Sequence, residues 1–145
     1  MRPLLLGLSL VFTAPQFAQA EMHEVKMLNR NASGPMVYEP DFLQVAPGDT
    51  VKFIAATSGH NAATVDGMAP DGAPGFKGGI NEEIEVRLDE EGFYGIKCSP
   101  HFAMGMVMVI RVGDAEIGER FAGAKVPARA RQRFDEILAR NGFGK

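Results

Sequence analysis

Short apolar stretches separated by turn sequences make up most of the chain up to residue 112. Residues 51–54 follow a Pro-Gly-Asp turn, residues 84–88 alternate apolar and charged side chains, and residues 93–97 follow a Glu-Gly turn. Residues 106–112, MVMVIRV, are almost entirely apolar, which is typical of a strand inside a sandwich. Several short strands between turns predict a mainly β protein with an antiparallel β-sandwich. The Gly- and Pro-rich residues 67–79 are predicted to form a long surface loop.

The C-terminal tail, from about residue 114, has a helical pattern instead. Pro127 suits a first helical turn, apolar residues recur on one stripe up to Leu138, and Gly142 suits a helix end. We therefore predict an amphipathic helix over residues 127–141 and a shorter helix over residues 115–122. The apolar stripe is expected to cover the sandwich, and a helix that binds a partner is the alternative.

Residues 1–20, MRPLLLGLSLVFTAPQFAQA, have the features of an export signal. Arg2 gives a basic start, a short apolar run follows, and small residues surround a cleavage position after Ala20. The apolar run is too short to span a bilayer and no second long run follows, so no membrane insertion is expected. The sequence predicts a signal peptide over residues 1–20 and a mature domain over residues 21–145.

Composition narrows the range of functions. The roughly 125 residues after the signal suffice for one domain. Removal of Arg2 changes the formal charge from -3 to about -4, and a nucleic-acid partner would require a basic surface instead. The single cysteine cannot form an internal disulfide in an exported chain, so the thiol needs another explanation.

The segment KCSPHFAMGM, residues 97–106, contains that cysteine, a histidine three residues later and two methionines. Two imidazoles and one thiolate, with a weak thioether, form a copper site that suits both Cu(II) and Cu(I). His101 lies in this segment beside Cys98, whereas His60 lies far upstream and must be brought in by the fold. His23 is expected to be a poor ligand because it lies beside the new terminus, where chains fray.

Each of these residues also has a purely structural interpretation. A lone cysteine is often a buried, unreactive thiol, histidines are common hydrogen-bonding residues, and methionines fill cores. Their combination is far less expected by chance: a Cys and a His at close spacing, a following Met, and an upstream His-Asn pair. The combination favours the copper site.

Residues 42–54, the pair His60-Asn61 and the loop CSPHFAMGM resemble the cupredoxins, and in particular the pseudoazurins. The resemblance extends over nearly all of residues 21–141. It implies a cupredoxin-like Greek-key sandwich of eight strands, one type 1 copper ion, and an electron shuttle in the periplasm. It also implies a nitrite reductase or another periplasmic redox enzyme as acceptor and a c-type cytochrome as electron source. We expect a monomer.

The same resemblance assigns the residues of the site. His60, Cys98 and His101 match the equatorial ligands of the family, and Met106 matches the axial ligand. Asn61 matches the residue after the first histidine, where its side chain can connect the two ligand loops and orient the ligands. An ordinary turn residue is the alternative for Asn61. Pro100 is expected in the shell around the ligands.

Met104 and Met106 both lie where an axial ligand is needed. In an extended segment both side chains would point the same way, so periodicity does not choose between them. Met104 follows His101 by three residues, as in amicyanin-like cupredoxins, and Met106 follows it by five, as in plastocyanin and pseudoazurin. The resemblance to pseudoazurins favours Met106 as the ligand and assigns Met104 to an apolar rim.

A docking surface around the exposed edge of His101 follows from the resemblance. Its expected apolar residues are Met36, Met104 and Pro35, since an apolar patch with a polar rim marks a docking site. A positive rim would orient the protein toward an acidic partner. Lys77 and Lys97 match rim lysines of pseudoazurins, Arg30 stands where a lysine is usual, and Ser58 stands where many relatives have lysine.

Two other functions compete with electron transfer. Cys98 with a histidine as base has the composition of a thiol nucleophile, but no motif for a substrate pocket accompanies it. A periplasmic copper carrier without an electron-transfer role is the second alternative. Such proteins more often use Met-rich or multi-His tracts, whereas the methionines of this chain are scattered. We therefore predict an electron carrier that is not an enzyme.

Overall fold

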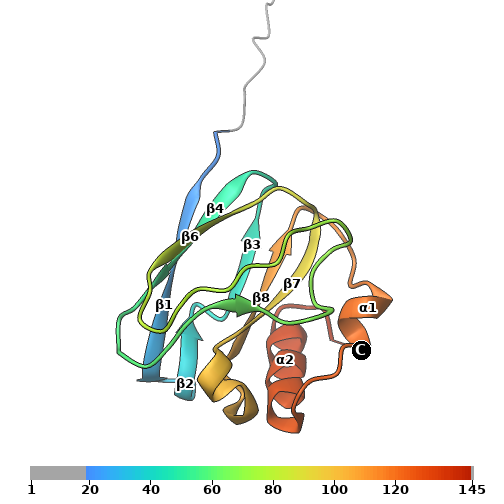
Figure 1. The fold of residues 1–145 in the computed structure, drawn as a ribbon. Helices are drawn as coiled ribbons and strands as arrows, with labels where there is room; N and C mark the ends of the chain where they lie inside the picture. Colours follow the sequence, from blue (N-terminus) through green and yellow to red (C-terminus); the bar gives the residue numbers. More distant parts are fainter. Residues whose placement is uncertain (1–18, 145) are drawn as a thin grey trace, which may run out of the picture.

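Two four-stranded sheets face each other and two helices lie beside one of them (Figure 1). The structure is a computed structural model that describes residues 19–144. The first sheet has the strand order β2-β1-β4-β6, and the second has the order β3-β8-β7-β5. Nearly all of the predicted signal peptide, residues 1–20, lies outside the described residues. The predicted sandwich with a helical tail is confirmed.

The four strands and two tail helices for which the sequence predicts bounds all appear in the structure close to those bounds. The shorter tail helix begins four residues later than predicted, and the strand predicted from residue 106 begins one residue later. The strands are β1 (Met22–Asn31), β2 (Gly34–Glu39), β3 (Phe42–Val45), β4 (Asp49–Ile54), β5 (Ala63–Thr64), β6 (Ile84–Leu88), β7 (Gly92–Lys97) and β8 (Val107–Val112); the helices are η1 (Ser99–Met104), α1 (Glu119–Ala122) and α2 (Ala128–Arg140).

The prediction of purely antiparallel sheets is wrong. Strand β1 runs parallel to β4 in the first sheet, and β3 runs parallel to β8 in the second. The other strand pairs are antiparallel. Alternation along a strand reports which face is buried and not which neighbour the strand pairs with, so the sequence pattern did not reveal these crossovers.

The second sheet is buried on both faces. On β8, Met108 and Ile110 belong to the core between the sheets, whereas Val107 and Val109 belong to a second cluster with the tail helices. Phe134 and Ile137 of α2 are fully buried in that second cluster. This explains why residues 106–112 are almost all apolar. It also confirms that the amphipathic tail covers the sandwich.

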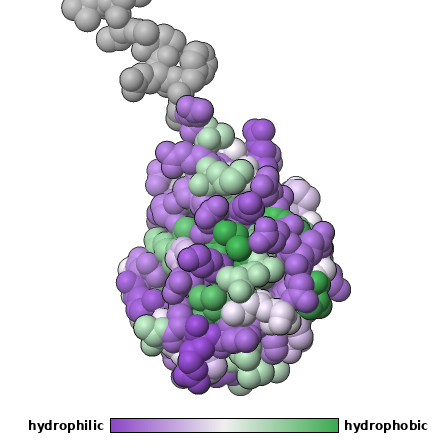
Figure 2. All heavy atoms as spheres, turned by 90° about the vertical axis from the view of Figure 1, so that its left-hand side faces the viewer, coloured by the Kyte–Doolittle hydropathy of each residue, from purple (hydrophilic) through white to green (hydrophobic). Residues whose placement is uncertain are grey.

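The first sheet is buried on one face only. Along β4, Val51 and Phe53 are fully buried and the intervening Lys52 is partly exposed. The side of the molecule that carries β1 and β6 is mainly polar, with scattered apolar side chains (Figure 2). A sheet with one solvated face produces the alternating pattern seen in residues 84–88.

The predicted loop over residues 67–79 is long but not wholly superficial. Met68 has no exposed surface, and Gly95 of β7 donates its N–H to the Met68 carbonyl across 2.7 Å. A Cβ atom at Gly95 would come within 2.9 Å of the Met68 side chain. The loop is therefore anchored on the second sheet through a glycine. None of the helices among residues 19–144 has the length and apolar character needed to cross a membrane.

Candidate metal centre

The segment from Cys98 to Met106 forms one compact turn between β7 and β8. Pro100 lies in the first turn of the 3-10 helix η1, where its missing N–H costs no hydrogen bond. Gly105 ends the helix with a φ of 86°, and a Cβ atom there would come within 3.1 Å of the Arg129 backbone. Cys98 donates its N–H to the Met106 carbonyl across 3.0 Å, which closes the turn. Pro100 itself is exposed and touches solvent.

His60 reaches the same place from the loop between β4 and β5. The His60 carbonyl accepts a hydrogen bond from the Asn81 N–H across 2.8 Å, and the Asn81 side chain accepts one from the Gly59 N–H across 2.6 Å. His60 is 1% exposed, whereas His101 is only partly buried. The long connection after β4 is therefore held at the end of the sandwich where the Cys98 turn lies.

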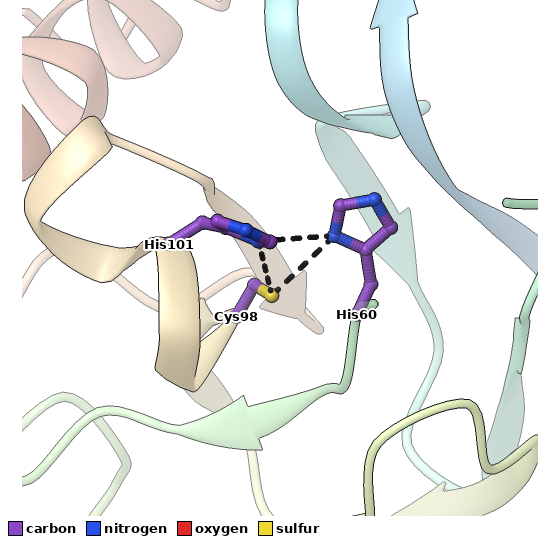
Figure 3. A group of neighbouring side chains, drawn as sticks. All are labelled: His60, Cys98 and His101. Atoms are coloured by element: carbon purple, nitrogen blue, oxygen red, sulfur yellow. Dashed lines mark hydrogen bonds between the residues drawn. The ribbon is translucent and has the colours of Figure 1, made fainter. Parts of the chain in front are cut away.

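Three potential ligand atoms converge at this end (Figure 3). Cys98 Sγ lies 3.4 Å from His101 Nδ1 and 3.7 Å from His60 Nδ1, and the two Nδ1 atoms lie 3.2 Å apart. The centre of this triangle is about 2.0 Å from each atom, close to the roughly 2.0–2.3 Å of nitrogen and sulfur bonds to a metal ion. The arrangement therefore fits a single ion.

The hydrogen bond on the far side of His60 selects the required tautomer. His60 Nε2 lies 2.7 Å from the Asn29 side-chain oxygen, which can only accept. The proton therefore resides on Nε2, and Nδ1 presents its lone pair to Cys98. Burial, followed by the charge of His101, lowers the pKa of His60. A neutral imidazole is the form that binds a metal.

Cys98 has no exposed surface, and burial raises the pKa of its thiol, against the opposing effect of the Asn61 and His101 N–H groups. A buried thiol with a raised pKa is a poor nucleophile, which argues against thiol catalysis. A metal cation at the centre of the triangle would reverse this preference, because coordination removes the thiol proton. The donor set of one thiolate and two imidazoles suits copper.

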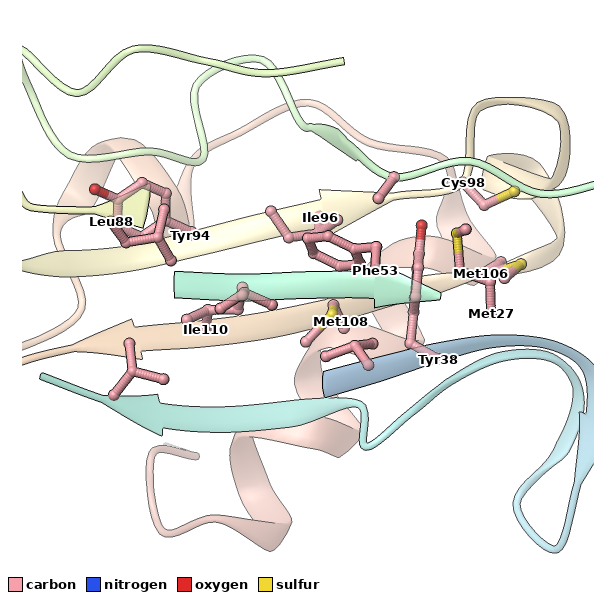
Figure 4. Close-up of a cluster of buried hydrophobic side chains, with 14 of the residues drawn as sticks. Met27, Tyr38, Phe53, Leu88, Tyr94, Ile96, Cys98, Met106, Met108 and Ile110 are labelled. Atoms are coloured by element: carbon pink, nitrogen blue, oxygen red, sulfur yellow. The ribbon is translucent and has the colours of Figure 1, made fainter. Parts of the chain in front are cut away.

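The two methionines lie in different environments. Met106 has no exposed surface, and its side chain lies beside Cys98 at the end of the core (Figure 4). Met104 is 51% exposed. The expectation that both point the same way holds only for an extended segment, and here η1 and Gly105 intervene. Burial therefore separates the two candidates, in favour of Met106 as a ligand.

Asn61 connects the segment of His60 to the segment of Cys98 by hydrogen bonds of its side chain. Its side-chain oxygen accepts the Ser99 N–H across 2.7 Å, and its amide group donates to the Gly78 carbonyl at 3.0 Å and to Ser99 Oγ at 3.2 Å. The alternative of an ordinary turn residue does not account for these bonds between distant segments. Asn61 is 2% exposed.

Two supporting residues were missed in the sequence, namely Asn29 and Tyr38. Asn29 orients His60, and the Tyr38 hydroxyl donates to the Asn61 carbonyl across 2.7 Å. Neither has a local signal, because Asn29 and Tyr38 lie 31 and 23 residues from their partners along the chain, on β1 and β2, whereas the partners lie in the loop after β4. His23 takes no part in the site. It lies within β1 and pairs with Asp49 at 2.9 Å, so the reason given for excluding it, a frayed terminus, is wrong.

Comparison with known proteins decides the family. Residues 25–113 match the family model of copper binding proteins, plastocyanin/azurin family. The chain is 44% identical over 131 residues to a pseudoazurin of Paracoccus pantotrophus, covering 90% of this chain and 89% of that protein. It is 45% identical over 109 residues to a pseudoazurin of Methylorubrum extorquens, covering 75% and 72%. The chain belongs to the plastocyanin/azurin family, among its pseudoazurins.

Solved structures agree with this assignment. A pseudoazurin structure from Sinorhizobium meliloti matches with a TM-score of 0.81 and 42% identity, covering 86% of this chain and 99% of that one. The fold is therefore the cupredoxin fold of the pseudoazurins. The chain is a type 1 copper electron-transfer protein, and copper is its cofactor.

Proposed function

We propose that His60, Cys98, His101 and Met106 hold one copper ion and that the chain carries single electrons between two periplasmic redox proteins without acting as an enzyme. The convergence of one sulfur and two nitrogen donors on a common centre carries this proposal. Copper, when bound, supplies a one-electron couple between Cu(II) and Cu(I). The residues of the chain supply a fixed geometry for it.

Rigidity of the donors supports electron transfer over copper delivery. The Cys98 turn is closed by a backbone hydrogen bond, and Asn61 connects it to the His60 segment. His60 is held from behind by Asn29. Donors that are held in place need little rearrangement between the two oxidation states, whereas a carrier that hands its ion over requires donors that can open.

His101 provides the exit for the electron. Its Nδ1 atom faces Cys98 and the residue is only partly buried, whereas His60 is 1% exposed, so His101 is the histidine ligand nearer the surface. Around it lie the exposed residues Pro100 and Met104 of η1, and we assign Met36 and Pro35 of β2 to the same apolar docking surface. Pro35 is exposed, and Met36 is partly buried with a φ of 51°.

Two lysines form the basic side of this docking surface. Lys97 of β7 and Lys77 both pair with Ala63, one on each side, so the three side chains share one face and the small alanine leaves a hollow between the lysines. Lys77, Lys97 and Ser99 line a surface hollow of about 700 Å³. The Lys97 ammonium lies 5.1 Å from the centre of the Phe102 ring. The arrangement suits an acidic side chain of a partner.

These features favour an acidic nitrite reductase or a similar periplasmic reductase as acceptor and a c-type cytochrome as donor. Residues 1–20 would serve as the export signal, and residues 21–145 would act as a monomer. Redox encounters are small and short-lived, so the charges act mainly on the association rate. Arg30 and Ser58 are both exposed, and the missing lysine at Ser58 weakens the rim.

Two measurements test the proposal. Titration of the mature protein with Cu(II) should saturate at one equivalent and produce intense visible absorption that bleaches on reduction and returns on oxidation without loss of metal. Ready loss of copper to a chelator, without a stable redox cycle, would favour the copper carrier instead.

Stopped-flow reduction of an acidic nitrite reductase tests the docking surface. Lys77→Glu and Lys97→Glu should each slow the reaction at low salt by about tenfold, with a smaller loss as salt rises. Lys26→Glu makes the same change in net charge on the outer face of β1 and serves as the matched control. If all three variants slow the reaction equally, the docking surface lies elsewhere.

A further inference from the structure

The backbone carbonyl of Asn61, the residue after His60, accepts a hydrogen bond from a tyrosine hydroxyl. The Tyr38 hydroxyl donates to the Asn61 carbonyl oxygen across 2.7 Å, and both residues are buried. Among residues 19–144 this oxygen accepts no other hydrogen bond. Without the phenol, a buried carbonyl would lack a partner at the position next to His60, and such a group is costly to leave unpaired.

Core packing fixes the position of that hydroxyl. Tyr38 lies opposite Met27 in the β1–β2 pair, and its ring packs edge-on against Phe53 with 6.1 Å between the ring centres. Its hydroxyl points toward the end of the core where Cys98 and Met106 lie (Figure 4). The ring is 1% exposed, so it has no room to turn away from the loop.

Asn29 lies on the same face of the first sheet. It follows Met27 by two residues along β1, which places both side chains on one side of the strand. Its side-chain oxygen accepts the bond from His60, while Tyr38 holds Asn61. The first sheet therefore holds residues 60 and 61 by two separate bonds. Cys98 and His101 follow β7 of the second sheet.

The position of His60 relative to Cys98 and His101 therefore depends on how firmly the first sheet holds residues 60 and 61. We propose that Tyr38 is a positioning residue of the metal centre: its hydroxyl fixes the segment His60-Asn61 so that His60 Nδ1 stays directed at Cys98 Sγ. This inference rests on the ligand set proposed above. The hydroxyl acts on His60 through the peptide group of Asn61, to which it donates.

The test compares the two tyrosines of the chain in the copper-loaded protein. Tyr38→Phe removes only the hydroxyl. Tyr94→Phe is the matched control, because the Tyr94 hydroxyl also donates to a carbonyl, that of Glu90 at 2.9 Å, at the opposite end of the core (Figure 4). Each loss removes one phenol–carbonyl bond, so both variants should melt at a lower temperature than the parent.

Only Tyr38→Phe should alter the centre itself. A less firmly held imidazole stabilises Cu(II) less, so the equilibrium against a fixed-potential mediator should move toward Cu(I) by about two- to fivefold. The relative intensities of the visible bands should change as well. Tyr94→Phe should leave the equilibrium and the bands unchanged. Equal effects in the two variants, or no effect in Tyr38→Phe, would overturn the inference.

A second experiment tests the role of the Tyr38 hydroxyl even if the Tyr38→Phe variant folds poorly. Growth of the Tyr94→Phe variant with 3-fluorotyrosine labels position 38 alone, because the chain has two tyrosines. The fluorinated phenol is a stronger donor, so the equilibrium should move slightly toward Cu(II). A shift toward Cu(I), or none, would count against Tyr38. Intense visible absorption in all these proteins separates a failure of this inference from a failure of the ligand set.

Discussion

The two ligand segments of this protein are built in opposite ways. The segment from Cys98 to Met106 supplies three of the four proposed ligands within nine residues, and it is closed by its own backbone hydrogen bonds. His60 comes alone, and its position depends on Asn29, Tyr38 and Asn81 from other parts of the chain. One segment is encoded locally, and the other is held by tertiary contacts.

The difference explains how a metal site can be both specific and rigid. A short loop fixes the distances between its own residues, but it cannot enclose an ion by itself. A distant histidine completes the site only when both sheets are assembled, so the packed core fixes the distances between His60 and the other ligands.

Replacing Cys98 by Ser should abolish the intense visible absorption of the copper-loaded protein. That absorption requires electron transfer from a thiolate to the metal, and serine supplies none. The fold should persist because it depends on its apolar core. Absorption spectra and circular dichroism of the variant check both statements. An intact visible spectrum would refute copper–thiolate ligation.

Replacing Met106 by Leu should alter the reduction potential much more than replacing Met104 by Leu. The axial ligand tunes the potential, and Met106 is buried beside Cys98 while Met104 is half exposed. We expect at least about a tenfold change in the redox equilibrium for Met106→Leu, about 59 mV. Electrochemistry of both variants provides the measurement. The reverse order of effects would assign the ligand to Met104.

Replacing Asn61 by Ala should weaken the connection between the two segments. The change leaves the Ser99 N–H and the Gly78 carbonyl without their partner, at a cost of about 1–3 kcal/mol in the free energy of unfolding. Asn31→Ala is the control, because Asn31 makes exposed hydrogen bonds and should cost less than about 0.5 kcal/mol. Equal losses in denaturant unfolding would show that Asn61 has no special role.

The smallest effect concerns Asp49, at the start of β4 and remote from His60 along the strand. Burial alone would raise its pKa, but hydrogen bonds from Glu21, His23 and Ala46 outweigh burial and lower it. A lowered folded-state pKa stabilises the fold above the unfolded value of about 3.9, and this contribution is lost as pH falls below it.

Between about pH 4 and pH 2, the unfolding free energy of the metal-free Asp49→Asn variant should therefore decrease less than that of the parent. At neutral pH the variant should be less stable than the parent but should bind copper with an unchanged spectrum. A changed spectrum would mean that this end of the sandwich also influences the centre, contrary to the separation described above.

The sequence by itself determined the local half of this protein. The spacing of Cys98, His101 and Met106 is a short-range property, as is the apolar stripe of the tail helix, and both appear in the structure as predicted. Alternation also located β6, because burial of one face leaves a period of two in the residues themselves. Turn signals located β4 and β7, and a continuous apolar run located β8.

Only the tertiary structure decided what depends on contacts between distant segments. The parallel pairs β1·β4 and β3·β8 leave no mark on alternation, and Asn29 and Tyr38 became supporting residues only when the first sheet met the loop of His60. The orientation of Met104 against Met106 likewise required the turn at Gly105. A pattern along one strand records burial, whereas a partner across the fold is specified by packing of the whole chain.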